Sequence, residues 1–126
     1  MAFTDYLENK LVAHTFSNTA YTSPTTVYVA LYTVTPTDST SGTEVSGGGY
    51  VRQSAAFTTT GNAATNSAAI EYPTATASYG TVVAVAILDA SSGGNMLAYA
   101  SLDTSKTIDT GDVFRIPAGD LDITLD

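Results

Sequence analysis

The sequence contains no cysteine and no tryptophan, and only 4 of its 126 residues are lysine or arginine. Without cysteine there are no disulfide bonds and no thiolate metal sites, so we expect side-chain packing and β-ladder hydrogen bonds to hold the fold. Charged residues make up 13% of the chain, about half of the roughly 25% that is usual. Serine and threonine replace them, which is typical of a protein that packs against other subunits or works outside a cell.

The charge is strongly one-sided, with 12 acidic residues, 4 basic residues and a formal net charge of −8. Four dispersed cations cannot neutralise a row of phosphates, so neither nucleic acid nor an anionic membrane surface is an expected partner. The acidic surface either keeps the protein soluble or matches a basic patch on a partner protein.

The length predicts one domain, residues 1–126, because a single core is normal at this size. Met1–Lys10 contains two acidic residues and lacks the apolar run of a signal peptide. No stretch approaches the roughly 20 apolar residues of a membrane span. We therefore expect the protein to be made in a cytoplasm and to leave it, if at all, by lysis or assembly.

Residues 1–17 predict one short N-terminal helix, from about Asp5 to Thr15, with Thr4 as its N-cap. Phe3, Leu7 and Leu11 are spaced by four residues and form one apolar stripe. A single helix of this length is marginal alone, so the stripe must dock either on the domain's own sheet or on a neighbouring subunit.

From Thr25 onward the pattern predicts short β-strands separated by turns. Val27–Val34 is apolar on both faces, which is typical of a central strand in a sandwich, and Thr81–Leu88 is the most apolar run in the chain. The fold class is therefore all-β, a single β-sandwich or jelly-roll-like domain of about eight strands. The expected strands are Val27–Val34, Tyr50–Phe57, Ala68–Tyr72, Thr81–Leu88, Met96–Leu102, Lys106–Ile108, Asp112–Ile116 and Leu121–Leu125.

One segment, Thr35–Gly49, is long, polar and rich in serine, threonine and glycine, with little to bury. We expect either a mobile surface loop or an arm that becomes ordered against a partner. Its three glycines at 47–49 lack the Lys-Ser/Thr of a phosphate-binding loop, so they are interpreted as a flexible hinge.

No set of residues with catalytic chemistry is evident. His14 is the only histidine, and a surface or capping role is far commoner at a helix end than catalysis. The acids near the end of the chain do not have the spacing of a calcium loop, although oxygen ligands at a turn could bind calcium. These are Asp109, Asp112, Asp120, Asp122 and Asp126. We predict a protein that is not an enzyme and has no cofactor or metal.

Two segments carry a resemblance: the opening MAFTDYLENKLVAHTFSNTAYTSPTTVYVALYTVTPTDS, with its ALYT-x-TPT pattern, and Tyr72–Asp126. Together with Gly47-Gly48-Gly49-Tyr50-x-Arg52, they resemble a family of small bacteriophage virion structural proteins, often labelled tail fibre proteins. Relatives tend to have Trp where this chain has Tyr79. The resemblance implies a structural part of the virion, assembled in the host cytoplasm and located in the particle, with no known catalysis.

Three functions are compatible with this sequence. The preferred one is a capsid decoration, or cement, protein that binds the outside of the head, with the major capsid protein as partner and a homo-oligomer, a trimer being favoured. The second is a tail or tail-fibre component or adaptor for host attachment, and the third is a carbohydrate-binding module. The residues predicted to meet a partner belong to the helix stripe and to the arm: Phe3, Leu7, Leu11, Thr43, Glu44, Val45 and Tyr50.

Overall fold

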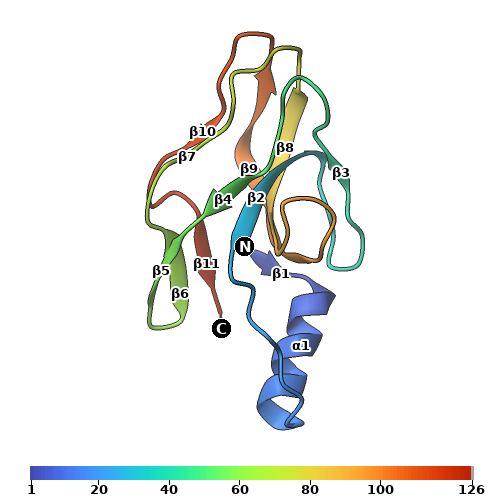
Figure 1. Cartoon of the computed structure of the whole chain (residues 1–126), viewed down its shortest axis with the longest axis vertical. Coiled ribbons are helices and arrows are strands. Elements are labelled where there is room, and N and C mark those ends of the chain that lie inside the picture. The colour runs from blue at the N-terminus through green and yellow to red at the C-terminus, as the bar shows by residue number, and fades with distance from the viewer. Residues whose placement is uncertain (126) are drawn as a thin grey trace.

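A six-stranded antiparallel sheet forms the centre of the molecule (Figure 1). The computed structural model describes residues 1–125. The strand order is β1-β9-β8-β2-β3, and β4 pairs with the same edge of β2 as β3 does. The strands of this sheet are β1 (Ala2–Phe3), β2 (Val27–Val34), β3 (Thr43–Glu44), β4 (Gln53–Ala55), β8 (Gly80–Leu88) and β9 (Met96–Ile108).

Two smaller sheets cover one face of the central sheet and complete the sandwich. The first contains β5 (Phe57–Thr60), β6 (Ala63–Asn66) and β11 (Asp122–Thr124), and the second contains β7 (Ile70–Glu71) and β10 (Arg115–Ile116). The predicted all-β, sandwich-like fold class with one short helix is confirmed.

The strand β2 has the two apolar faces that its sequence predicts. Val29 and Leu31 lie in the main core, against residues of the smaller sheets, whereas Ala30 and Tyr32 belong to a second buried cluster on the opposite face. Because both faces are covered, all four residues are nearly inaccessible to solvent. The neighbouring strand β8 occupies the middle of the sheet, in agreement with its apolar sequence.

The long strand β9 contains a bulge where the sequence predicts a break. Val82 of β8 pairs with Lys106, and Ala84 pairs with Ser101, so two steps along β8 correspond to five along β9. The predicted strands Met96–Leu102 and Lys106–Ile108 are therefore one strand with three extra residues looped out between them. Such bulges bend a strand and redirect its side chains.

The helix α1 (Asp5–Phe16) begins after the predicted N-cap, because the Thr4 side chain accepts a hydrogen bond from the Leu7 backbone N–H. The predicted stripe is wrong in one respect: Phe3 precedes the helix and belongs to β1, where it pairs with Ala98. No residue of α1 is fully buried, and in Figure 1 the helix projects from the lower end of the molecule. Among residues 1–125 there is no helix long and apolar enough to cross a membrane.

The segment Thr35–Gly49 has more to bury than predicted. Its residues Thr43 and Glu44 form β3, the side chain of Val45 is in the main core, and Pro36 is fully buried. The expectation that this segment has little to bury is wrong because its two apolar residues, separated by polar ones, both find buried positions. Its mobility and its role as an arm stay predictions.

Candidate interaction surfaces

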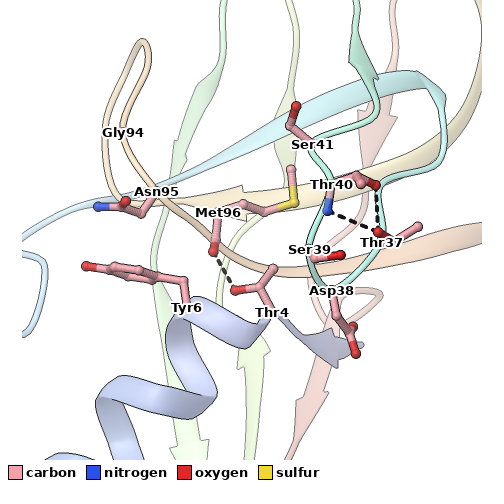
Figure 2. A pocket seen from close by; sticks show the side chains of 10 residues that line it. All are labelled: Thr4, Tyr6, Thr37, Asp38, Ser39, Thr40, Ser41, Gly94, Asn95 and Met96. Atoms are coloured by element: carbon pink, nitrogen blue, oxygen red, sulfur yellow. Dashed lines mark hydrogen bonds between the residues drawn. The ribbon is translucent and has the colours of Figure 1, made fainter.

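The start of α1 is fixed to the central sheet by one buried threonine. The Thr4 hydroxyl donates to the Met96 carbonyl at 2.6 Å, and the Thr4 backbone N–H donates to the Leu97 carbonyl at 3.0 Å (Figure 2). The Asp5 N–H donates to the Asp38 carbonyl at 3.0 Å, which ties the helix to the polar segment as well. The first turn of α1 is therefore held on two sides, while the rest extends away from the sheet.

Three exposed carboxylates gather beside this attachment. Oxygen atoms of Asp5, Glu8 and Asp38 lie within 4.8 Å of one another. The Tyr99 hydroxyl donates to Asp38 Oδ1 at 2.5 Å, and this hydrogen bond raises the pKa of Tyr99. The helix N-terminus stabilises negative charge through its free N–H groups. The surface beside the start of α1 therefore carries a cluster of negative charge.

A polar hollow of about 200 Å³ lies next to these acids (Figure 2). Side-chain hydroxyls from the polar segment line one wall, and the start of α1 and the end of the β8–β9 connection line the others. Thr37 and Thr40 bond to each other through their hydroxyls at 2.6 Å. The lining residues are Thr4, Tyr6, Thr37, Asp38, Ser39, Thr40, Ser41, Gly94, Asn95 and Met96. The hollow offers hydrogen-bonding groups but holds no histidine or other strong base beside a nucleophile.

The two faces of α1 differ in exposure. Leu7 and Leu11 are half-buried and face the body of the protein, and Leu7 packs against the main core. On the opposite side, Glu8, Val12 and Phe16 are spaced by four residues and share one exposed face. The side chain of Val12 is 57% exposed and that of Phe16 is 82% exposed. We call these two apolar residues the helix ridge.

A second notable arrangement, formed by Glu44, Tyr50 and Arg52, joins β3, the segment between β3 and β4, and the β8–β9 connection; we call these three residues the clasp. Arg52 binds both carboxylate oxygens of Glu44 at 2.9 Å and also donates to the carbonyls of Ala90 and Gly93. The Tyr50 hydroxyl donates to Glu44 Oε2 at 2.7 Å and accepts from the Leu31 N–H at 3.0 Å. The Tyr50 hydroxyl thereby provides a hydrogen-bond acceptor for the Leu31 N–H of β2, which lies between the stretches of β2 that pair with β3 and with β4.

The clasp shifts the ionisation of its members. Burial alone would raise the pKa of Glu44, but the hydrogen bonds from Arg52 and Tyr50 and the Arg52 charge outweigh it, so the pKa is lowered from its ordinary value of 4.5. Burial and the Glu44 hydrogen bond raise the pKa of Tyr50. Tyr32 is not part of the clasp but pairs with Glu44 across the two strands; burial, with a smaller contribution from the Glu44 charge, raises its pKa to about 12. The clasp therefore exists as an ion pair with a neutral phenol at neutral pH.

Replacing Arg52 by alanine is expected to lower the free energy of unfolding by about 2–3 kcal/mol, because a largely buried carboxylate loses its bidentate partner. The side chains of Arg52 and Glu44 are only 9% and 25% exposed, so water cannot fully replace the hydrogen bonds that the Glu44 carboxylate loses. Urea denaturation followed by tyrosine fluorescence measures the change. Arg52→Lys keeps the charge without the planar fork, and we expect an intermediate loss.

The pH dependence distinguishes the ion pair from simple packing. Because the pKa of Glu44 is lowered in the folded state, its contribution is present above pH 4.5 and is lost as the pH falls through the folded-state value. The wild-type protein should therefore lose more stability than Arg52→Ala between pH 6 and pH 3. Equal acid sensitivity of both proteins would contradict this assignment.

The residues predicted to meet a partner fall into two separate groups. The first group contains Phe3 in β1 and Leu7 and Leu11 in α1, and all three are half-buried. Thr43 and Glu44 are in β3, beside Val45 and Tyr50, at the far edge of β2. Val45 is only 4% exposed, and Glu44 and Tyr50 already bind within the clasp, so these three are occupied internally. An interface role for the others stays a prediction.

Sequence reasoning missed a groove of about 510 Å³ beside the β9 bulge. Buried apolar side chains and the half-buried Leu102 form its floor, and charged side chains form its rim. We call it the β9 groove, and its lining is Val85, Leu102, Asp103, Thr104, Lys106, Phe114, Arg115, Ile116, Pro117, Asp120 and Leu121. The only signal in the sequence was the interruption between the two strands expected at 96–108.

Other candidate residues have local structural roles. The His14 Nδ1 atom accepts a hydrogen bond from the Tyr21 N–H at 3.0 Å. Asp112 accepts one from the Asp109 N–H at 2.9 Å, as a turn residue. Gly48 has a φ of +63°, and a Cβ there would lie 2.5 Å from the Ala77 carbonyl oxygen, so this position requires glycine. Asp126, one of the acids considered for calcium, lies outside the described residues.

A family model described as Podophage GP4 fiber I protein gp80 matches residues 2–124. This range includes the helix, all the strands, the clasp and the β9 groove. No curated protein matches the chain at a significant level.

Proposed function

Because the chain belongs to the Podophage GP4 fiber I protein gp80 family, we propose that it serves in the fibre apparatus of a phage particle as a structural subunit. The predicted resemblance to small phage virion structural proteins is confirmed by this match, and the protein is a virion component. We propose that it acts through contacts with other virion proteins and carries out no catalysis. Assembly in the host cytoplasm stays a prediction.

The family match over residues 2–124 carries this proposal. The sequence alone favoured capsid decoration, but the matched family is named after a fibre, which favours the second of the three functions that the sequence allowed. The surface supports a role in contacts: an acidic cluster at the start of α1 provides charge, and the projecting helix ridge provides an apolar anchor for another protein.

The test is the position and copy number of the protein in purified particles. We expect quantitative mass spectrometry to give tens of copies per particle and cryo-electron microscopy to place them at the tail or neck. Hundreds of copies spread over the head would contradict the fibre role and support capsid decoration with the major capsid protein as partner. A virion lacking the protein altogether would contradict both.

A further inference from the structure

The helix ridge is an apolar feature without a partner inside the described part of the chain. Val12 and Phe16 are 57% and 82% exposed, and they lie on the side of α1 that faces away from the sheet. A single exposed hydrophobic residue is common, but two at neighbouring positions of one projecting helix make a compact anchor. Aromatic side chains, phenylalanine among them, are enriched at the buried centres of protein interfaces.

The β9 groove is large enough to take such an anchor. Its volume of about 510 Å³ falls within the range of roughly 300–1,000 Å³ that is typical of sites that enclose a ligand group. Leu102, which the bulge places at the groove, is half-buried, and Phe114 and Leu121 lie beneath it in the core. The groove thus presents an apolar floor to an inserted aromatic ring.

Opposite charges also lie near the two features. Glu8 lies one helical turn before Val12, with Asp5 in the first turn and the cation Lys10 on the same helix, and Lys106 and Arg115 lie on the rim of the β9 groove. Within residues 1–125 the only ion pair joins Arg52 to Glu44, so both rim cations are available to a partner. These are two of only four cations in a chain with twelve acids. Asp103 and Asp120 on the same rim reduce the attraction and limit the orientations in which a second acidic helix can approach.

The ridge cannot reach the groove of its own chain. Figure 1 shows α1 forming the lower tip of the molecule, with its last residues farthest from the sheet, whereas β10 and the C-terminal half of β9 lie in the upper half. The first turn of α1 is fixed by Thr4 and by the bond from Asp5 to Asp38, so the helix cannot fold back without breaking these contacts. A contact between the two features therefore requires a second copy.

We propose that copies of this chain associate head to tail, with the helix ridge of one copy seated in the β9 groove of the next. Such a contact joins two different surfaces, and it closes into a ring, such as a trimer, or continues as a filament, according to the rotation between copies. The inference goes beyond the proposed function, because self-association can fail in a protein that is still found in the fibre apparatus.

The contact is small, since one helix end enters one groove. Interfaces below about 1,200 Å² are typically weak, so the isolated protein should associate reversibly at high concentration. In a particle, where copies are held near one another, the same contact gains from a high effective concentration.

Sedimentation velocity of the full chain, at concentrations up to about 1 mM, tests the proposal. We expect the wild-type sedimentation coefficient to rise with concentration. Val12→Ser and Phe16→Ser should weaken association about tenfold to a hundredfold, because each removes a buried apolar side chain from the contact. The matched control is Val34→Ser, since Val34 is 55% exposed but lies at the end of β2. Circular dichroism checks that each variant is folded.

A mixing experiment separates this contact from other modes of association. The Phe16→Ser variant keeps an intact groove, and the double variant Lys106→Glu, Arg115→Glu keeps an intact ridge. Each should be monomeric alone, and an equimolar mixture should form a one-to-one dimer. A monomeric wild-type protein at every concentration, an effect of Val34→Ser equal to that of Val12→Ser, or a mixture that stays monomeric would each overturn the proposal.

Discussion

Replacing Tyr72 by alanine is expected to lower the free energy of unfolding by about 3–5 kcal/mol, the largest effect of a single substitution that we foresee. Tyr72 is 2% exposed. Its ring stacks on Tyr50 at a centroid distance of 6.1 Å and meets the edge of Phe114 at 5.8 Å. The free energy of unfolding of a domain is typically only about 5–15 kcal/mol, so the variant should retain little stability. Urea denaturation monitored by circular dichroism measures the loss.

The variant Tyr72→Phe isolates the contribution of the hydroxyl group. This hydroxyl donates to the Val29 carbonyl at 2.7 Å and so links the smaller sheets to β2. Losing one buried hydrogen bond should cost about 1–2 kcal/mol, clearly less than losing the ring. If Tyr72→Phe and Tyr72→Ala were equally destabilising, ring packing would not be the main contribution and our account of the core would be wrong.

Replacing Asn66 by alanine should lower the free energy of unfolding by about 3–4 kcal/mol, because four side-chain hydrogen bonds to the backbone are lost at once. The Asn66 amide donates to the carbonyls of Ala68 and Pro117, and its Oδ1 atom accepts from the N–H groups of Gly119 and Leu121. The side chain is 2% exposed, so water cannot easily replace these bonds. Chemical denaturation gives the value, and hydrogen exchange of the Leu121 amide should increase.

The isosteric variant Asn66→Asp provides a sharper comparison. It keeps the acceptor but places a carboxylate against two carbonyl oxygens, in a site closed to solvent. We expect it to be at least as destabilised as Asn66→Ala at pH 7. Because its carboxyl group should have a raised pKa in the folded state, it should regain stability as the pH falls toward 5. Asn66→Asp with wild-type stability at pH 7 would show that the two donated bonds contribute little.

The parts of the fold that followed from the sequence are those with strong local patterns. Val27–Val34 was predicted with its observed bounds, because β-branched and aromatic residues fill both faces of the strand. By contrast, β6 (Ala63–Asn66) was missed, since Ala-Ala-Thr-Asn has no strand signature and is held by its partners β5 and β11. The predicted strand Tyr50–Phe57 contains β4 and the start of β5, which pair in different sheets.

The clasp and the β9 groove were beyond sequence reasoning for a related reason. Arg52 reaches Glu44 across 8 residues and Ala90 across 38, and nothing in the order of residues indicates which acid an arginine will bind. The sequence did identify Glu44 and Tyr50 as notable but assigned them to a partner, whereas they bind one another. Exposure of Val12 and Phe16 likewise depends on the direction in which α1 leaves the sheet, which Thr4 and Asp38 determine.

The bulge in β9 has a consequence for how this edge of the sheet meets other chains. Beyond the short segment that β1 covers, the outer side of β9 has no partner strand among residues 1–125. A regular strand with an unpaired edge could pair with the same edge of further chains and so lead to amyloid-like aggregation. The three looped-out residues interrupt the ladder of backbone donors and acceptors, so an incoming strand finds only short stretches to pair with. The bulge therefore protects this edge of the sheet from pairing with the backbone of another chain.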